Sequence, residues 1–321
     1  MNNSIGVLVA VAAILYGTPL LYAALGEVLA ERSGILNLGI EGMMLVGAAM
    51  GYWSVQHIGG PTWVSLAIAT AVAAAAGAAT AAIHAFLTIT LRANQIVSGL
   101  TLTIFAGAFG LSSYLASSLR LSDAPARKTF DAVLPKSWQE LPVVGPILFG
   151  HNMLVYISWV LTVLVGLYLA RTRHGLNTRA VGESPAAADS LGINVTAYRY
   201  VHTIAGGAFA GVGGAFYSLS LTPTWVDGLT FGAGWIALAL VIFAFWRADL
   251  CLVGAYLFGA FSSVGFILQA RGIWDAVPPE AFQALPYVMT ILALLAVSSG
   301  WAKRRLGAPG ALGIPYVREE R

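Results

Sequence analysis

Polar side chains able to contact a solute gather in two short stretches of an otherwise apolar chain. The first stretch holds Asn37 and Glu41, together with Gly34 and Gly39. The second supplies amide and hydroxyl groups from Asn94, Gln95, Ser98 and Thr101. Amides and hydroxyls suit a neutral, hydroxyl-rich solute, because such a solute needs hydrogen-bond partners and not fixed charge. We therefore predict that the polar residues of both stretches line a path for such a solute.

Residue patterns of three catalytic sites are absent from the sequence. The five histidines never show the His-Glu-x-x-His spacing of a zinc metalloprotease. No Gly-x-Ser-x-Gly elbow is present, and no Gly-x-x-x-x-Gly-Lys-Ser/Thr loop is present to cradle the phosphates of ATP. We therefore predict that the chain is not an enzyme and does not hydrolyse ATP by itself.

The composition indicates a lipid environment. Hydrophobic residues make up 58% of the 321 residues and charged residues 10%, against about 25% charged residues in soluble domains. The apolar residues form long runs, such as residues 63–91, and a run of about 18 or more predicts a transmembrane helix. We therefore predict an all-α, polytopic transmembrane helical bundle in which residues 1–321 form a single domain.

Nine apolar segments are candidate spans, and we expect about 8–10 spans in the bundle. The segments are 5–25, 41–56, 63–91, 96–118, 151–170, 200–222, 231–247, 250–270 and 284–300. The second segment is short and follows the glycine-bearing residues 33–39, so we predict one broken or re-entrant helix near residues 33–45. Such backbone persists at membrane depth only where protein or a water-filled cavity surrounds it.

Small residues recur four positions apart within the predicted spans. The pairs are Gly47 with Gly51, Gly207 with Gly211, and Ala255 with Gly259. This spacing is typical of close contacts between transmembrane helices. We interpret the pairs as packing positions, with a gap opened for a solute as the alternative.

The cationic residues predict the orientation, since Lys and Arg concentrate in cytoplasmic loops. Of the 17 Lys and Arg, twelve fall on one side of the predicted spans and five on the other. The larger group is Arg32, Arg92, Arg171, Arg173, Arg179, Arg199, Arg247, Lys303, Arg304, Arg305, Arg318 and Arg321, and the smaller is Arg120, Arg127, Lys128, Lys136 and Arg271. The larger group predicts the cytoplasmic side. Because these charges lie at the ends of apolar runs and form no basic patch, we expect no nucleic-acid partner.

This orientation places the long loops and the C-terminus. Residues 119–150 are predicted to form an outer loop that carries four prolines. Residues 171–199 are predicted to form a cytoplasmic loop, and residues 301–321 a cytoplasmic tail. The chain is therefore expected to be a multi-pass protein with its C-terminus inside.

The cytoplasmic loop has the signals of one short helix. Pro185 suits the first turn, Ser184 the N-cap, and Gly192 the end of that helix. Its apolar face would consist of Ala186, Ala187 and Leu191. Such a projection suits contact with another protein.

Several segments resemble the permease subunits of ATP-binding-cassette importers, in the branch that serves branched-chain amino acids, simple sugars and nucleosides. They are Glu31–Met43 (ERSGILNLGIEGM), Asn94–Gly99 (NQIVSG), Arg179–Ile193 (RAVGESPAAADSLGI) and Gly234–Ile242 (GWIALALVI). The resemblance extends from about residue 16 to about residue 265. It is closest to the smaller of the two paralogous permeases in nucleoside-type systems.

The resemblance implies a permease that moves a nucleoside or a sugar inward by alternating access, driven by a partner ATPase. The residues that it assigns to ATPase coupling are Gly182, Glu183, Ser184, Pro185, Ala186, Ala187, Leu191 and Gly192. The implied partners are a paralogous permease subunit in a heterodimer, a cytoplasmic ABC ATPase and an extracytoplasmic solute-binding protein. ATP and Mg would be bound by the ATPase, with no cofactor in this chain. The implied location is the bacterial inner membrane.

Two other classes of membrane protein remain open from the residues alone. An ion-coupled secondary transporter of a small polar solute would need ionisable groups inside its spans, and His84 is the main candidate. The second class is a non-transporting membrane scaffold or a channel, and a channel would allow flux of the solute with neither ATP nor an ion gradient. Each class predicts a different energy requirement for uptake, which an experiment can measure.

Overall fold

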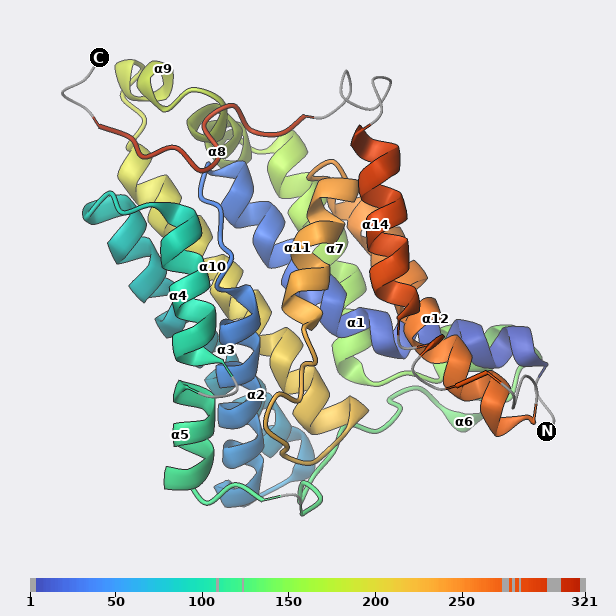
Figure 1. Cartoon of the computed structure of the whole chain (residues 1–321). Coiled ribbons are helices and arrows are strands. Elements are labelled where there is room, and N and C mark those ends of the chain that lie inside the picture. The colour runs from blue at the N-terminus through green and yellow to red at the C-terminus, as the bar shows by residue number, and fades with distance from the viewer. Residues whose placement is uncertain are drawn as a thin grey trace.

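The computed structural model describes residues 4–107, 110–122, 124–272, 277–278, 281–282, 284–298 and 307–317, and it is predominantly helical (Figure 1). The α-helices are α1 (Ile5–Arg32), α2 (Ile40–His57), α3 (Thr62–Ala85), α4 (Gln95–Ala106), α5 (Leu111–Ser118), α6 (Lys136–Gln139), α7 (Met153–Arg171), α8 (Arg173–Glu183), α9 (Pro185–Ser190), α10 (Val195–Phe216), α11 (Ala233–Phe243), α12 (Ala248–Ala270) and α14 (Leu285–Ser298). Turns of π-helix occupy Phe86–Thr90, Gly145–Phe149 and Tyr217–Leu221. Within these ranges no strand forms, and one isolated bridge joins Ala132 to Asn152.

Among the described residues, six helical segments are long and apolar enough to cross a membrane. They are Ile5–Arg32, Thr62–Thr90, Gln95–Ser118, Met153–Arg171, Val195–Leu221 and Ala248–Ala270. The three other apolar segments of the sequence correspond to α2, α11 and α14, although residues 299–300 lie outside the described residues. The prediction of an all-α, polytopic bundle is confirmed.

The predicted break near residues 33–45 is present as an irregular segment between α1 and α2. Residues Ser33–Gly39, hereafter the α1–α2 linker, carry no helix, and α2 begins at Ile40. Figure 1 shows that α2 and α11 both begin at mid-depth in the bundle and run toward opposite ends. The linker therefore brings irregular backbone into the interior of the bundle.

Helix α10 packs closely against α2 and α3 through glycines. A Cβ atom at Gly47 would lie 2.4 Å from Cα of Gly211, and one at Gly211 would lie 2.2 Å from the carbonyl oxygen of Ala73. A Cβ at Gly207 would lie 2.6 Å from the carbonyl oxygen of Gly77. The interpretation of these small residues as packing positions is confirmed, since the contacts exclude even one methyl group.

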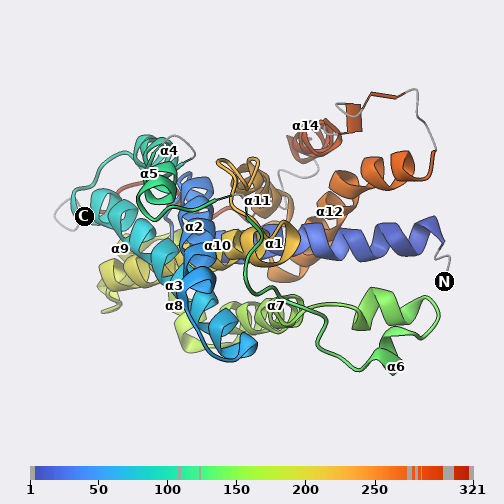
Figure 2. The same cartoon turned by 90° about the horizontal axis from the view of Figure 1, so that it is seen from below.

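Helix α1 makes the same kind of contact with α12. A Cβ at Gly259 would lie 2.2 Å from the carbonyl oxygen of Ala13, and one at Gly17 would lie 2.5 Å from that of Ala255. Viewed from below, in Figure 2, the N-terminal half of α1 and the neighbouring α12 extend together away from α2–α5. Glycine contacts therefore join the first spans of the chain to its later spans.

The bundle has two ends of different construction, which we name by the helix found there. The α9 end gathers α8, α9, the end of α1, the end of α11 and the start of α10 (Figure 1). The α5 end gathers α5, the end of α2 and the segment that follows α5. Arg32, Arg173, Arg179 and Arg199 of the larger group lie on these elements of the α9 end, and Arg120, Arg127 and Lys128 of the smaller group lie in the segment that follows α5. Lys303, Arg304, Arg305, Arg318 and Arg321 lie outside the described residues.

Candidate functional site

Two side chains hold the backbone of the α1–α2 linker at Leu36. The Leu36 N–H donates to Oε1 of Gln95 at 2.7 Å, and Nε2 of His84 lies 3.1 Å from the Leu36 carbonyl oxygen. The other ring nitrogen of His84 lies 3.0 Å from Oγ of Ser98. All three side chains are buried. They therefore supply the hydrogen bonds that an irregular peptide lacks inside a membrane.

The same face of α4 supports the next residues of the linker. Oγ1 of Thr103 donates to the Leu38 carbonyl oxygen at 2.7 Å. A Cβ at Gly99 would lie 2.7 Å from the Leu38 nitrogen, so only glycine allows this approach. Gln95, Gly99 and Thr103 are spaced by four residues, which aligns them on one side of a helix. Helix α4 thus acts as a support for the linker.

Asn37 is buried at the centre of the linker and bonds both to α1 and within the linker. Its N–H donates to Oε1 of Glu27 at 3.0 Å, and its Oδ1 accepts from the Gly39 N–H at 3.1 Å. Asn37 and Glu27 each have 0% exposure. The Asn37 side chain therefore closes a local turn ahead of α2.

A second set of contacts joins α2 to the start of α11. Oε1 of Glu41 accepts from Oγ1 of Thr230 at 2.5 Å and from the Gly232 N–H at 3.0 Å, and Oε2 accepts from the Gly234 N–H at 2.7 Å. A helix N-terminus favours a carboxylate because its first N–H groups have no partner within the helix. We call these four residues the Glu41 joint.

Glycine is required at two positions of the Glu41 joint. Gly232 has φ +80°, which a residue with a side chain rarely adopts. A Cβ at Gly234 would lie 2.6 Å from both Cα and the nitrogen of Glu41. The sequence analysis did not identify Thr230 or Gly232. The Thr-x-Gly-x-Gly pattern directly before an apolar run is the signal that indicates such a helix start.

The six predicted path residues divide into two groups. Four are buried and hold the linker or α11: Asn37, Glu41, Gln95 and Ser98. The other two are exposed on the chain: Asn94 and Thr101. Oδ1 of Asn94 accepts from the Val97 N–H at 3.1 Å, so this residue caps α4. Their assignment to a solute path stays a prediction.

The short helix predicted in the 171–199 loop is present as α9. It begins at Pro185, and Gly192 follows its end with φ +80° and donates its N–H to the Asp189 carbonyl oxygen at 2.9 Å. Ser184 occupies the N-cap, but its side chain makes no capping hydrogen bond. The predicted role of that hydroxyl as a cap is therefore wrong, whereas Pro185 occupies the first turn of the helix as predicted.

Helix α9 has an exposed apolar side and a buried one. Leu191 is 80% exposed, and Ala186 and Ala187 are exposed beside it. Ala188 is buried and packs in a cluster with Val181. The predicted apolar face of the loop helix therefore points away from the chain and is available to another protein.

Helix α8 is tied to α7 and α10 by polar contacts. Nε2 of His202 lies 2.9 Å from the hydroxyl oxygen of Tyr168 and 3.0 Å from Oγ1 of Thr178. Nδ2 of Asn177 donates to the hydroxyl of Tyr198 at 2.9 Å. The pair α8–α9 is therefore anchored to two membrane-spanning helices, although its tip is exposed.

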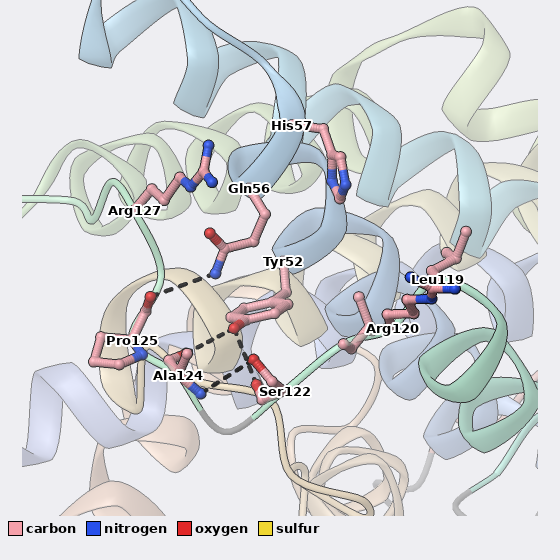
Figure 3. A pocket seen from close by; sticks show the side chains of 10 residues that line it. Tyr52, Gln56, His57, Leu119, Arg120, Ser122, Ala124, Pro125 and Arg127 are labelled. Atoms are coloured by element: carbon pink, nitrogen blue, oxygen red, sulfur yellow. Dashed lines mark hydrogen bonds between the residues drawn. The ribbon is translucent and has the colours of Figure 1, made fainter.

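A pocket of about 510 Å³ opens at the α5 end. Figure 3 shows that the hydroxyl of Tyr52 points toward Ser122 and Ala124, and it lies 3.0 Å from the carbonyl oxygen of Ser122 and 2.6 Å from that of Ala124. Other residues of the lining are Gln56, His57, Leu119, Arg120, Leu121, Pro125 and Arg127. The pocket thus has a positively charged rim built largely from the segment that follows α5.

Comparison with known proteins gives a consistent result. Residues 9–294 match the family described as "Branched-chain amino acid transport system / permease component". The chain is 38% identical to the putative glucose ABC transporter permease TsgC13 of Haloferax volcanii, across 94% of this chain and 95% of that protein. It is 33% identical to the guanosine ABC transporter permease NupQ of Bacillus subtilis, across 97% of this chain and 96% of NupQ. NupP, a second guanosine permease protein of B. subtilis, is 24% identical across 89% of this chain and 80% of NupP.

Proposed function

Because this chain belongs to the family of permease components of branched-chain amino acid transport systems, we propose that it moves a nucleoside or a sugar inward through the membrane. It is a multi-pass membrane protein, the permease subunit of an ABC importer, and not an enzyme. The family implies an ATPase and a solute-binding protein as partners. Transport would proceed by alternating access driven by that ATPase.

The exposed tip of α9 is the observation that carries this proposal. A permease with no phosphate-binding loop must receive motion from a partner, and a rigid projection can transmit it. Helix α9 is capped at Gly192, buried at Ala188 and exposed at Leu191. These properties support assignment of residues 182–193 to ATPase coupling.

The α9 end is proposed to face the cytoplasm of a bacterial cell, with the inner membrane as the location. Cationic residues gather at this end: Arg32 at the end of α1, Arg171 at the end of α7, Arg173 and Arg179 in α8, and Arg247 after α11. This concentration favours the cytoplasmic side. This orientation makes α9 and the C-terminus accessible to a cytoplasmic ATPase. The pocket at the α5 end would then face the solute-binding protein.

The solute path is proposed to lie between this chain and a paralogous permease subunit. The glycine contacts of α10 with α2 and α3 leave no room for a solute at those positions. Asn94 and Thr101 are exposed on α4, on the side away from the linker. A second subunit placed against this side would enclose them in a heterodimer. The presence of both NupQ and NupP in one organism supports such a pair.

Uptake into proteoliposomes tests the function directly. The chain is reconstituted with a paralogous permease, an ATPase and a binding protein from its own organism, and uptake of labelled guanosine and glucose is measured. We expect uptake of one of them only with ATP and the ATPase present. Uptake driven by an ion gradient without the ATPase would instead establish a secondary transporter. Uptake that needs neither would establish a channel.

A further inference from the structure

Residues 307–317, hereafter the tail, lie across the α9 end and contact the end of α8. The Ala311 N–H donates to the Gly182 carbonyl oxygen at 2.8 Å, and the Gly310 N–H donates to Oε2 of Glu183 at 3.3 Å. Ala311 is 6% exposed. The tail is therefore packed onto the residues that lead directly into α9.

The same tail contacts the start of the α1–α2 linker. The Gly313 N–H donates to the Gly34 carbonyl oxygen at 3.4 Å, and Nη1 of Arg32 donates to the Gly307 carbonyl oxygen at 3.2 Å. A Cβ at Gly182 would lie 2.2 Å from the Arg32 carbonyl oxygen. The ends of α1 and α8 thus meet at a distance that admits no side chain, and the tail is hydrogen-bonded to both.

Two further contacts extend the tail to α9 and α10. The hydroxyl of Tyr316 donates to Oδ2 of Asp189 at 3.0 Å, and its ring packs on the cluster that contains Ala188. Nη1 of Arg199 donates to the Ile314 carbonyl oxygen at 3.3 Å. Arg199 is only 2% exposed, and this is the one hydrogen bond that its guanidinium makes within the described ranges. Nε and Nη2 of Arg199 have no partner among the described residues, so the tail supplies the single hydrogen bond of a buried cation, which favours one position for the tail.

We propose that the tail is a strap that transmits movement of α9 to the α1–α2 linker during transport. The inference rests on the proposed function and assigns Tyr316 and Ala311 as positioning residues. Helix α9 is short and moves with whatever binds its exposed tip, whereas the linker lies within the bundle on α4. The tail bonds to both. A displacement of α9 must therefore pull on the linker or break these hydrogen bonds.

The test measures the number of solute molecules taken up per ATP hydrolysed by the reconstituted, complete transporter. Two variants are compared with the wild type: a chain that ends at residue 306, and Tyr316→Ala. We expect both to hydrolyse ATP, with uptake per ATP lowered about 5-fold or more, the lower range of a typical coupling free energy. Ile314→Ala is the matched control, because the Ile314 side chain is 56% exposed and its backbone makes the contact. This control should retain the wild-type ratio.

The outcomes separate a strap from a merely structural segment. Equal uptake per ATP in the wild type and in Tyr316→Ala would overturn the proposal, as would a parallel fall of uptake and ATP hydrolysis at constant ratio. If the truncated chain does not accumulate, Tyr316→Ala alone decides the question, and Tyr316→Phe should restore part of the ratio by restoring the packing. Absence of ATP-driven uptake in the wild type would count against the proposed function itself.

Discussion

The Glu41 joint and the tip of α9 look alike in the sequence but are opposite in the structure. Each combines an acidic residue, small residues and glycines next to an apolar stretch. In the Glu41 joint the carboxylate is 7% exposed and accepts three hydrogen bonds. At the tip of α9, Leu191 is 80% exposed. The carboxylate of the Glu41 joint is bonded within its own chain, whereas the apolar tip of α9 is available to a partner.

This difference indicates that the Glu41 joint stabilises the bundle, whereas the tip of α9 serves coupling to a partner. An ionisable residue inside a membrane protein is by default a candidate for a functional site. Glu41 shows that such a residue can instead connect two helices, because both carboxylate oxygens accept hydrogen bonds from residues at the start of α11 or just before it. We therefore expect substitutions in the Glu41 joint to lower the stability of the whole bundle. Substitutions at the tip of α9 should lower coupling and leave stability unchanged.

The largest effect is expected for Glu41→Ala. The variant leaves the Thr230 hydroxyl and two N–H groups without a partner. Each buried donor left unsatisfied costs about 1–3 kcal/mol, so the total loss should be about 3 kcal/mol or more. Thermal unfolding of the purified protein in detergent would measure the loss. Glu41→Gln is the matched control and should lose about half as much, because its amide oxygen still accepts. An unchanged melting temperature for Glu41→Ala would refute a structural role.

Gly234→Ala should have the second-largest effect. The added Cβ would lie 2.6 Å from Cα of Glu41, and overpacking of this kind costs about 1–3 kcal/mol. The control is Gly166→Ala in α7, where the nearest atom to an added Cβ is 3.9 Å away. Unfolding of both variants is measured in parallel. If the two variants have equal melting temperatures, α2 and α11 can move apart to accept the added methyl group at little cost.

Gly192→Ala should destabilise α9 alone. The position has φ +80° and no atom within 4 Å of an added Cβ, so the variant bears only the backbone penalty of about 1–2 kcal/mol. Hydrogen exchange of residues 185–193 should accelerate, while the melting temperature of the bundle stays constant. Gly192→Asn, which tolerates this backbone conformation better, should exchange more slowly than Gly192→Ala. If the two variants exchange at the same rate, this explanation is wrong.

Leu191→Asp should have the smallest effect on stability and a clear effect on coupling. Exposed substitutions usually change stability by less than about 0.5 kcal/mol, whereas the new charge would sit in the apolar face offered to the ATPase. Uptake per ATP hydrolysed should fall while the melting temperature remains that of the wild type. Leu191→Met keeps the face apolar and should couple normally. If Leu191→Asp keeps the wild-type uptake per ATP hydrolysed, the apolar face of α9 does not contact the ATPase.

The sequence was sufficient to predict features that depend on neighbouring residues. The apolar runs predict the helices, the glycine-bearing residues 33–39 predict the break, and Pro185 with Gly192 predicts the bounds of α9. Each of these signals acts over a few residues, through burial of one segment or the conformation of one backbone position. These features can therefore be predicted from a few neighbouring residues at a time.

Only the tertiary structure decided what the polar residues contact. Glu41 bonds to Gly234, 193 positions away, and Gln95 bonds to Leu36, 59 positions away. An amide or a carboxylate in an apolar segment needs hydrogen-bond partners whether it lines a path or holds a backbone, so its residue type is the same in both cases. Which partner it finds depends on which helices the glycines bring together. For this reason the sequence determined a membrane bundle with a capped loop helix, and the packing of α2, α4 and α11 determined the role of the polar groups.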